Sequence, residues 1–503
     1  MDTGDRPQQR PQGVWDRLER AEMRGRKWRP AARAAAPGER PDPSRPPGTD
    51  RLPLLKHIVV LMMENHSYDN YLGMLRGRGD GFPLGADGEP DVWNPGSGGQ
   101  RIRAHHLTST RQRAGIPSQS WHATHHQWQG GSCDGFVTAT QQVVDKPGTD
   151  QLGAAAVAMG YWTEQDLPFY YGLARTFPLA DRWFGSCLGP TFPNRRFLIA
   201  GTAHGLISDA PYDLLDYPPA GTVFDALTRH GISWVNYHPV AADQSRFRRY
   251  HHHSRRMARR RLLSAGRFHQ SVAQGIQKDI QFTADVYPVG FGRYMEHVRS
   301  TDEFFADARD GTLPAFSIVD PDFTEFSEEN PQDVQRGESF AAEVINAVMH
   351  GRGWPGTLLI WTYDEHGGYY DHVPPPAAVP PDDVLGRSLL GSPTPLQRML
   401  RPLFPGPVAE EQNLTEGPVR FDRYGFRVPA VLVSPYARQD FVSSEVFDHT
   451  SVLKLVGEKW NLPALTRRDA AATAPLGLLD LDGPPAFLDP PKLPEPALKW
   501  GTW

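Results

Sequence analysis

The chain has 503 residues, of which 39% are hydrophobic, and it contains 48 glycines and 48 prolines. Its 53 basic and 58 acidic side chains give a formal net charge of −5, which argues against binding to nucleic acid through overall charge. No apolar run approaches the roughly 20 residues of a transmembrane helix. The first fifty residues contain no apolar segment typical of a secretory signal, so we expect a cytoplasmic location by default and leave export open. Two cysteines, Cys133 and Cys187, are too few for a disulfide framework, and they form either one bridge or two buried thiols.

Composition divides the chain into three regions. Residues 1–50 are rich in Arg, Pro and Gln and predict a disordered arm. Residues 51–470 contain the apolar segments and predict the folded domain, and residues 471–503 form a Pro-rich tail. Stretches with weak strand and helix signals predict loop-rich insertions at about residues 74–120, 240–300 and 377–420.

The folded part begins with a continuous apolar run at residues 56–63, which is typical of a strand covered on both faces. Glu64 and Asn65 follow directly, so both emerge at the end of this strand. Their side-chain oxygens can bind a metal ion. The alternative is a helix cap, in which Asn65 or Ser67 starts a helix with Asp69 in its first turn.

Three histidines follow a tryptophan in residues 121–136. His122, His125 and His126 stand at the i, i+3 and i+4 positions of a helix, so they share one face. Such a face can bind a metal, but exposed histidines on a helix are commoner than metal sites. The spacing by itself is therefore weak evidence.

Residues 189–202 predict a rigid loop that opens a helix. Thr191 stands between two prolines, where a metal ion can activate its hydroxyl as a nucleophile. The free N–H groups of a helix N-terminus bind anions, and Arg195 or Arg196 can hold phosphate oxygens in a bidentate fork. The alternative is an ordinary helix start, with Thr191 outside any site.

The segment from Arg246 to Arg261 contains eight arginines, three consecutive histidines and no acid. Such a basic run can contact an anionic membrane surface or a substrate phosphate. The alternative is a solvated surface segment. If the first interpretation is right, the protein is a peripheral membrane protein with no transmembrane segment.

Two later apolar runs also end in acids. Residues 314–319 lead to Asp320, and residues 358–361 lead to the adjacent carboxylates Asp364 and Glu365. Carboxylate oxygens suit a hard divalent cation, and the two glycines that follow Glu365 allow a tight turn. The alternative is a polar loop that caps a strand.

Strand and helix signals alternate through about 400 residues, which predicts one large α/β domain with a mostly parallel sheet. Open sheets of this class place their sites at the carboxyl ends of the strands. Glu64, Asn65, Asp320, Asp364 and Glu365 all stand at such ends, so we expect one polar site there.

In the order of these segments, the chain resembles the phosphoesterase family of bacterial and plant non-specific phospholipases C and related acid phosphatases. The resemblance implies the alkaline-phosphatase-like fold, an α/β three-layer sandwich, with residues 51–470 as the catalytic domain. It rests on the order and spacing of several blocks, namely residues 64–69 with Gly73, residues 189–195, residues 364–373, residues 426–429 with Ser434 and Pro435, and residues 448–451.

The resemblance also implies a role for each matching residue. Thr191 matches the nucleophile that takes up the phosphoryl group, and Asn194 and Arg195 match the motif beside it. A divalent metal ion (Ca²⁺, Mg²⁺, Mn²⁺ or Zn²⁺) is implied as the cofactor, with Glu64, Asn65, Asp364 and Glu365 as its ligands. Positions that recur around the family's site are matched by Asp371, His372, Arg427, Asp448 and His449.

Three positions depart from the family's pattern. His66 replaces the usual Arg, Gln119 replaces a His, and Asn330 replaces the His of a Glu-His-Pro motif. If the missing histidines protonate the leaving group, the chemistry of this protein differs there, since acid–base assistance contributes roughly 10²–10⁴-fold in rate. His125 and His372 remain as candidate proton donors.

The combined prediction is a phospholipase C-like hydrolase that cleaves phosphodiester bonds of phospholipid head groups through a phosphothreonine on Thr191. An acid-phosphatase-type phosphomonoesterase is the first alternative. A non-catalytic relative that binds phosphate or anionic lipid is the second. A phosphoester or phospholipid is the expected partner, and nucleic acid is not.

Overall fold

The computed structural model describes the greater part of the chain. The described residues are 40–112, 115–143, 151–209, 217–239, 283–287, 294–323, 325–381, 420–499 and 501. The basic run from Arg246 to Arg261 lies outside them, as do most of the predicted insertions at 240–300 and 377–420. No helix in this part of the chain combines the length and apolar character needed to cross a membrane.

An eight-stranded sheet forms the centre of the fold, and it confirms the prediction of a mostly parallel α/β architecture. Neighbouring strands are parallel except at β12, which runs antiparallel to β11 and β6. The order across the sheet is β13 (Val442–Ser443), β6 (Leu179–Ala180), β12 (Ala430–Val433), β11 (Thr357–Tyr363), β1 (His57–Met63), β10 (Phe316–Val319), β8 (Trp234–His238) and β9 (Val298–Ser300).

The two long central strands, β1 and β11, explain where polar residues gather. Nearly every residue of both strands is buried, because helices cover both faces of the sheet. Their register pairs His57 with Thr357 and Met63 with Tyr363, so the two strands end level with each other. The residues that follow, Glu64 and Asp364, therefore leave the same edge of the sheet.

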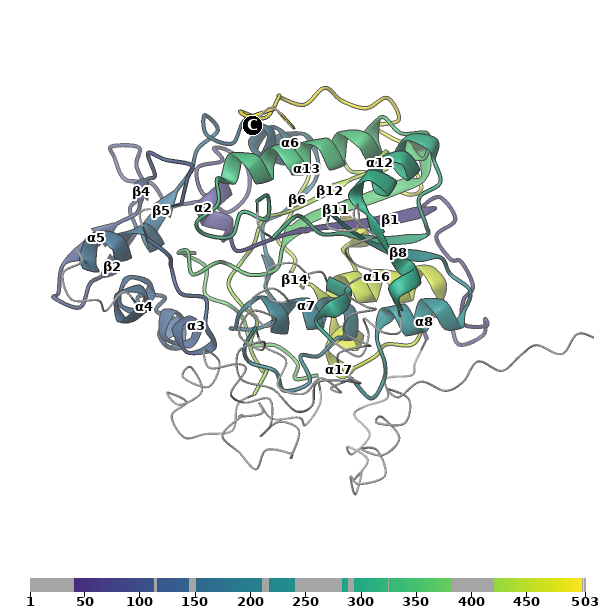
Figure 1. Ribbon diagram of the computed structural model, residues 1–503, viewed down its shortest axis with the longest axis horizontal. Coiled ribbons are helices and arrows are strands. Elements are labelled where there is room, and N and C mark those ends of the chain that lie inside the picture. The colour runs from purple at the N-terminus through teal and green to yellow at the C-terminus, as the bar shows by residue number, and fades with distance from the viewer. Residues whose placement is uncertain are drawn as a thin grey trace, which may run out of the picture.

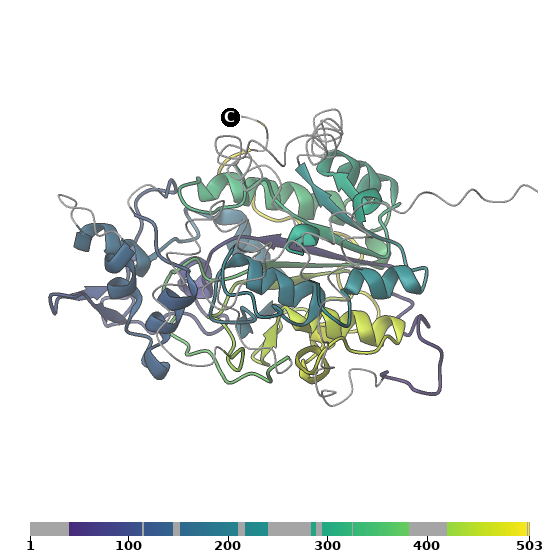
Figure 2. The same cartoon turned by 60° about the horizontal axis from the view of Figure 1, so that its bottom comes forward.

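Helices cover the sheet on both faces, which confirms the three-layer arrangement (Figures 1 and 2). One layer contains α6 (Pro168–Thr176), α12 (Thr301–Asp310) and α13 (Val334–Met349). The opposite layer contains α7 (Thr191–Ala200), α8 (Val223–Arg229), α16 (Thr450–Trp460) and α17 (Arg467–Ala471). α13 packs on the sheet through one apolar face, because Phe340, Val344 and Val348 recur at helical spacing and are buried.

The predicted insertion at residues 74–120 is part of a lobe at one end of the sheet (Figure 1). A second hydrophobic cluster, which includes Phe136, Tyr161 and Phe426, holds this lobe to the domain. The lobe contains β2 (Trp93–Pro95), β3 (Arg101–Arg103), β4 (His105–His106), α3 (Trp121–Trp128), α4 (Phe136–Val143), α5 (Gln151–Ala156) and β5 (Gly160–Tyr161). The short helix α2 (Tyr68–Leu72), which follows β1, packs in the main core instead. A short parallel pair, β7 (Trp183–Phe184) and β14 (Phe447–Asp448), lies beside the main sheet.

The segments at the two ends of the domain pack on it. Residues 40–50, at the end of the predicted arm, meet the C-terminus of α16, where Nδ2 of Asn461 donates to the carbonyls of Asp42 (2.9 Å) and Arg45 (2.9 Å). In the Pro-rich tail, the carbonyl of Phe487 accepts from the indole of Trp354 at 2.9 Å. In both terminal segments, main-chain carbonyls thus accept hydrogen bonds from buried side chains of the domain.

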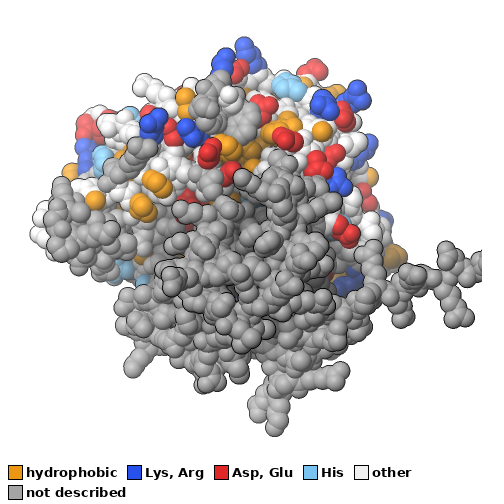
Figure 3. All heavy atoms as spheres, viewed as in Figure 1, with side chains coloured by type: hydrophobic (Ala, Val, Ile, Leu, Met, Phe, Trp, Pro, Cys, Tyr) orange, Lys and Arg blue, Asp and Glu red, His pale blue; other side chains and the backbone are white. Residues whose placement is uncertain are grey.

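Both cysteines are free and buried, which decides between the two alternatives for Cys133 and Cys187. On the face shown in Figure 3, the described Lys and Arg side chains are interspersed with Asp and Glu. The distribution of charge on this face agrees with the nearly balanced composition.

Candidate active site

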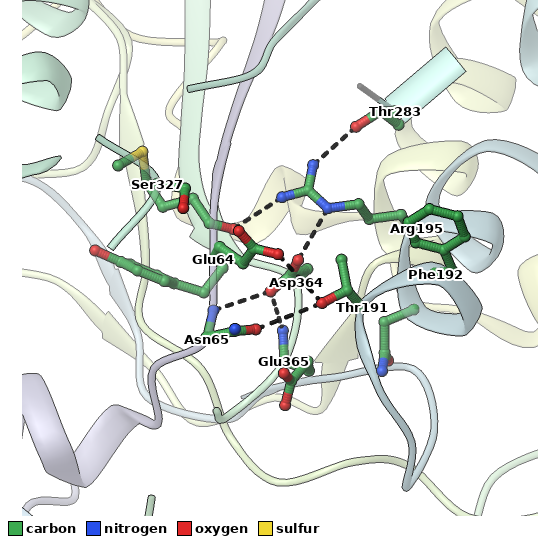
Figure 4. A network of polar contacts seen from close by, with 12 residues as sticks. Glu64, Asn65, Thr191, Phe192, Arg195, Thr283, Ser327, Asp364 and Glu365 are labelled. Carbon is green, nitrogen blue, oxygen red and sulfur yellow. Dashed lines mark hydrogen bonds and ion pairs between the residues drawn. The ribbon is translucent and has the colours of Figure 1, made fainter. Parts of the chain in front are cut away.

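Oxygen-bearing side chains from three separate segments meet beyond the ends of β1 and β11 (Figure 4). The Thr191 hydroxyl donates toward Oε1 of Glu64 at 3.3 Å and Oδ1 of Asn65 at 3.5 Å. Oδ1 of Asp364 accepts the backbone N–H groups of Asn65 (3.1 Å) and Glu365 (2.8 Å). All five residues are buried. One carboxylate thus ties together the two strand ends that carry the predicted metal ligands.

The turns after β1 and β11 interlock. Asn65 has a φ of 70° and Gly367 a φ of 65°, both in the left-handed region that favours glycine. A methyl group added at Gly367 would lie 1.8 Å from the carbonyl oxygen of Asn65. Only glycine fits this position, and its N–H donates to Oε2 of Glu365 at 2.8 Å. The glycine turn predicted from the sequence therefore also fixes the position of a carboxylate.

Asn194 holds the loop that carries Thr191. Its Nδ2 donates to the carbonyls of Gly189 (2.8 Å) and Pro190 (3.0 Å), and its Oδ1 accepts the N–H of Cys187 at 3.1 Å. Thr191 is consequently the first residue of α7, where backbone N–H groups are free of helical partners. Asn194 thus shapes this loop and does not reach the carboxylates itself.

Asp209 is a site residue that the sequence analysis did not single out. Its Oδ1 accepts the N–H of Phe192, the residue after Thr191, at 2.9 Å. An acid at a helix N-terminus is stabilised by the free N–H groups and the helix dipole. No pattern around Asp209 marks it in the sequence, because the contact depends on a return of the chain to the start of α7.

Arg195 extends from α7 to the side of the carboxylates (Figure 4). Its guanidinium donates to Oδ2 of Asp364 at 2.9 Å and Oδ1 of Asp320 at 2.8 Å, and it reaches the hydroxyl of Thr283 at 3.0 Å. The side chain is 1% exposed. The bidentate fork expected for a phosphate is therefore directed at two carboxylates, and Arg195 holds Asp364 in place. The neighbouring Arg196 donates to two main-chain carbonyls.

Asp448 and His449 lie behind Asp364. Nε2 of His449 is 2.6 Å from the carbonyl oxygen of Asp364, and since a carbonyl only accepts, this nitrogen carries the proton. Burial lowers the pKa of His449, so the imidazole is neutral. Asp448 accepts from the hydroxyls of Ser186 (2.8 Å) and Thr450 (2.5 Å). The two residues support the strand end rather than contact Thr191.

Asp371, His372 and Arg427 form a separate cluster with Asp69. Arg427 donates to Asp371 at 2.9 Å and to Asp69 at 3.1 Å, and Nδ1 of His372 lies 2.7 Å from Asp69. Ligand atoms of Asp69, Asp371 and His372 lie within 4.8 Å of one another, so these three side chains could hold a metal ion. Arg427 already brings a positive charge to both carboxylates, and a metal ion would have to compete with it.

The histidines of α3 have different partners despite their shared spacing. Nδ1 of His125 bonds the carbonyl of Trp121 within its own helix at 2.7 Å, and Nε2 of His126 bonds the hydroxyl of Thr138 at 2.8 Å. Burial lowers the pKa of His125, which favours the neutral ring. The contacts of His125 are thus with α3, whereas those of His372 are with the cluster around Arg427.

The departures from the family's pattern lie in and beside an aromatic region next to the site. His66 is buried and stacks on Tyr71 (4.3 Å between ring centroids) and Tyr369 (5.0 Å), and burial lowers its pKa to about 3. Asn330 donates to the hydroxyl of Tyr369 at 3.0 Å. Gln119 is half-buried just before α3. His66 and Asn330 therefore have structural partners, and His66 stays uncharged at neutral pH.

Glu328 forms the centre of this aromatic region. Its carboxyl accepts from the hydroxyls of Tyr71 (2.9 Å), Tyr170 (2.7 Å) and Tyr363 (2.5 Å). Burial raises the pKa of Glu328 to about 8, although the three hydroxyl donors favour the charged form. The preceding carbonyl, that of Ser327, accepts the N–H of Glu64 at 3.2 Å. The cluster thus supports the end of β1 from behind.

We expect the replacement of Glu328 by glutamine to change how stability depends on pH. A carboxyl with a pKa of 4.5 when unfolded and about 8 when folded stabilises the protein fully below pH 4.5, and this contribution is lost as the pH rises to 8. Relative to the wild type, Glu328→Gln should gain about 1.4 kcal/mol of unfolding free energy per pH unit between pH 5 and 8. Urea unfolding at several pH values measures this, with Glu343→Gln on α13 as the control. Parallel curves for variant and wild type would contradict the expectation.

The oxygens around Thr191 suit a hard divalent cation. Oε2 of Glu64 and Oε1 of Glu365 are buried and have no hydrogen-bond partner among the described residues. Burial and neighbouring carboxylates raise the pKa of both groups well above the ordinary range, because the negative charges repel one another. Buried carboxylates without partners are costly unless they are protonated or bind a cation. The free oxygens of Glu64 and Glu365 therefore fit the group that the family implies, and Asn65 and Asp364 lie beside them. A metal ion here would share Asp364 with Arg195, which pairs with that carboxylate at 2.9 Å.

Comparisons with known proteins agree with this site. The sequence profile described as the phosphoesterase family matches residues 55–463. Phospholipase C B of Mycobacterium tuberculosis is 30% identical over 471 residues, which cover 87% of this chain and 81% of that protein. Non-specific phospholipase C1 of Arabidopsis thaliana is 28% identical, with 89% and 75% covered, and non-hemolytic phospholipase C of Pseudomonas aeruginosa is 28% identical, with 81% and 54% covered. The chain belongs to the phosphoesterase family and is a hydrolase that acts on phosphoric ester bonds.

Proposed function

We propose that this protein is a metal-dependent phosphodiesterase of the phospholipase C type, with Thr191 as its nucleophile. The observation that carries the proposal is the position of the Thr191 hydroxyl, 3.3 Å from Glu64 and 3.5 Å from Asn65 at the start of α7. A hydroxyl beside buried, unpartnered carboxylate oxygens is poised to lose its proton. The three relatives named above are all called phospholipase C, which supports the diester substrate.

In the proposed reaction, each step is carried out by a named group of the chain or by water. Oε1 of Glu64 accepts the hydroxyl proton of Thr191, and Oγ1 attacks phosphorus in line. The new Oγ1–P bond replaces the P–O bond to the glycerol oxygen, which leaves as an alcohol after taking up a proton. Water then hydrolyses the phosphothreonine ester, releases the phosphorylated head group and returns the proton to Thr191. Asp364 and Arg195 keep Glu64 and Thr191 in register throughout.

Four side chains would hold the divalent metal ion, namely Glu64, Asn65, Asp364 and Glu365. A bound cation supplies charge neutralisation for the attacking oxygen and for the phosphate oxygens. Arg195 contributes to this site indirectly, because it holds Oδ2 of Asp364. The other oxygen, Oδ1, then accepts the N–H groups of Asn65 and Glu365 at the two strand ends. Oxygen-rich ligands favour the harder ions Ca²⁺, Mg²⁺ and Mn²⁺ over Zn²⁺.

A paired assay tests the function. Purified protein is given a chromogenic choline phosphodiester, a chromogenic glycerol phosphodiester and a chromogenic phosphomonoester, each with added metal or with EDTA. We expect diester hydrolysis that EDTA abolishes and a divalent metal restores. Preference for the monoester would favour the acid-phosphatase alternative at the same site. Full activity in EDTA after extensive dialysis would contradict metal dependence.

Metal content separates the two clusters of acids. We expect Glu365→Gln to lower the bound metal per chain by at least about tenfold, because it removes a charged ligand. His372→Gln, in the cluster around Arg427, should leave the metal content unchanged. Elemental analysis after dialysis against limiting metal measures both variants. Loss of metal in His372→Gln, with retention in Glu365→Gln, would instead place the ion on Asp69, Asp371 and His372.

A further inference from the structure

A cavity of about 470 Å³ lies beside the nucleophile loop, between α3 and residues 420–423. Trp121, His125 and Trp128 line it from one side of α3, since they stand at helical spacing. The rest of the apolar wall is formed by Phe421, Leu188, Cys187, Ala377 and Ala378. The metal-ligand residues do not line this cavity, so it is distinct from the cluster around Thr191.

The wall of the cavity is continuous with the nucleophile loop. Leu188 precedes Gly189, Pro190 and Thr191 in the chain, and a methyl group added at Gly189 would lie 3.0 Å from Cε3 of Trp121. Phe192, which follows the nucleophile, packs against the hydrophobic cluster that contains Trp121. The cavity therefore adjoins the loop that carries Thr191, because Leu188 belongs to both.

The size of the cavity selects one part of a phospholipid. A volume of about 470 Å³ lies in the lower half of the range of roughly 300–1,000 Å³ that is typical of small-ligand pockets. A head group of six to a dozen heavy atoms fits within it. Two long acyl chains, with some thirty carbons, exceed it. The cavity thus suits the substituent that stays on phosphorus after the diacylglycerol leaves.

The charges around the cavity select among head groups. Arg420 and Arg423 line it, and the described lining residues include one acid, Asp422. The guanidinium of Arg423 lies 4.2 Å from the ring centroid of Trp128, so it covers an aromatic face that a quaternary ammonium group would use. Since His125 is neutral, the described lining carries a net positive charge, which repels a cationic substituent.

We propose that this cavity binds the head group of the phosphodiester and favours uncharged or anionic, hydroxyl-bearing groups such as glycerol over quaternary ammonium groups such as choline. The proposal rests on the proposed function of the same site. Aromatic walls stack the carbon skeleton of the group, and the two guanidinium groups donate to its hydroxyl or anionic oxygens. The relevant selectivity is a difference in kcat/KM between substrates that share one leaving group.

The test uses two p-nitrophenyl phosphodiesters that differ in the substituent retained on phosphorus, glycerol in one and choline in the other. We expect kcat/KM for the glycerol diester to exceed that for the choline diester by at least about tenfold. In the double variant Arg420→Gln/Arg423→Gln this ratio should fall at least about fivefold. Arg352→Gln, an exposed arginine outside the cavity, should leave the ratio unchanged.

Binding without turnover provides a second readout. In Thr191→Ala with metal present, calorimetry should show tighter binding of glycerol phosphate than of phosphocholine, and the arginine double variant should reduce the difference. Equal kcat/KM values for both diesters, or a ratio that the double variant does not change, would overturn the cavity proposal and leave the phosphodiesterase function intact. Hydrolysis of monoesters alone would overturn both. Selectivity that survives the double variant but is lost in Arg352→Gln would place the head group elsewhere.

Discussion

Replacement of Thr191 by alanine is expected to lower kcat for phosphodiester hydrolysis by at least about a thousandfold. In the proposed mechanism the Thr191 hydroxyl accepts the phosphoryl group, and it faces the oxygens of Glu64 and Asn65. The methyl group of alanine leaves the start of α7 unchanged, since the loop is held by Asn194. Steady-state assays with a chromogenic diester measure the loss, and the unfolding midpoint should stay within a few degrees of the wild type.

The matched variant is Thr191→Ser, which keeps the hydroxyl and should retain activity within roughly a hundredfold of the wild type. Acid quenching during turnover, followed by mass spectrometry of the peptide that contains Thr191, should find the phosphoryl adduct in the wild type and in Thr191→Ser. An alanine variant with full turnover would show that water, or another side chain, attacks phosphorus directly.

Replacement of Arg195 by methionine is expected to destabilise the fold by about 3–5 kcal/mol, because it leaves two buried carboxylates without their cation. Asp364 and Asp320 are both fully buried, and each accepts from Arg195 at less than 3 Å. Methionine is nearly as long as arginine, so the lost free energy of unfolding reflects the missing charge and hydrogen bonds more than a change in side-chain volume. Urea unfolding at pH 7 measures the change. Activity should fall as well, because Asp364 orients Asn65 and Glu365.

A double variant identifies the cause of this loss. Arg195→Met combined with Asp320→Asn should be more stable than the sum of the single changes predicts, since one of the orphaned charges is removed. Arg78→Met is the matched control: its guanidinium donates to the main-chain carbonyls of Ala174, Phe177 and Phe441, so its loss strands no carboxylate there. Equal losses for Arg195→Met and Arg78→Met would refute the role given to the buried ion pairs.

The strands around the site could be predicted because their signal is local. Residues 57–63 are apolar at every position but the first, and such a continuous run is typical of a strand that is buried on both faces. The acids directly after β1 and β11 then have to emerge at an edge of the sheet. That β1 and β11 are neighbours, with β10 on the other side of β1, is a matter of long-range pairing and is not visible in either segment.

The partners of the charged residues could not be predicted in the same way. Arg195 stands one turn after Thr191, and its sequence position suits phosphate binding as well as an ion pair. Its actual partners, Asp320 and Asp364, lie more than a hundred residues away in the chain. Likewise, nothing near Asp209 in the sequence shows that the chain returns to the N-terminus of α7. Burial decides these pairings, since a buried guanidinium must find carboxylates wherever the fold brings them.

The sequence by itself determined the α/β class, the acids at the strand ends, the threonine at a helix start and the glycine turn after Glu365. Each of these depends on residues that are adjacent in the chain. Only the tertiary structure decided which acids meet Thr191 and which meet Arg427, because Asp69 and Asp371 stand only four and six residues after Asn65 and Glu365. The end of β1 brings Glu64 and Asn65 to the Thr191 hydroxyl, and the turns that follow β1 and β11 carry Asp69 and Asp371 to the separate arginine cluster.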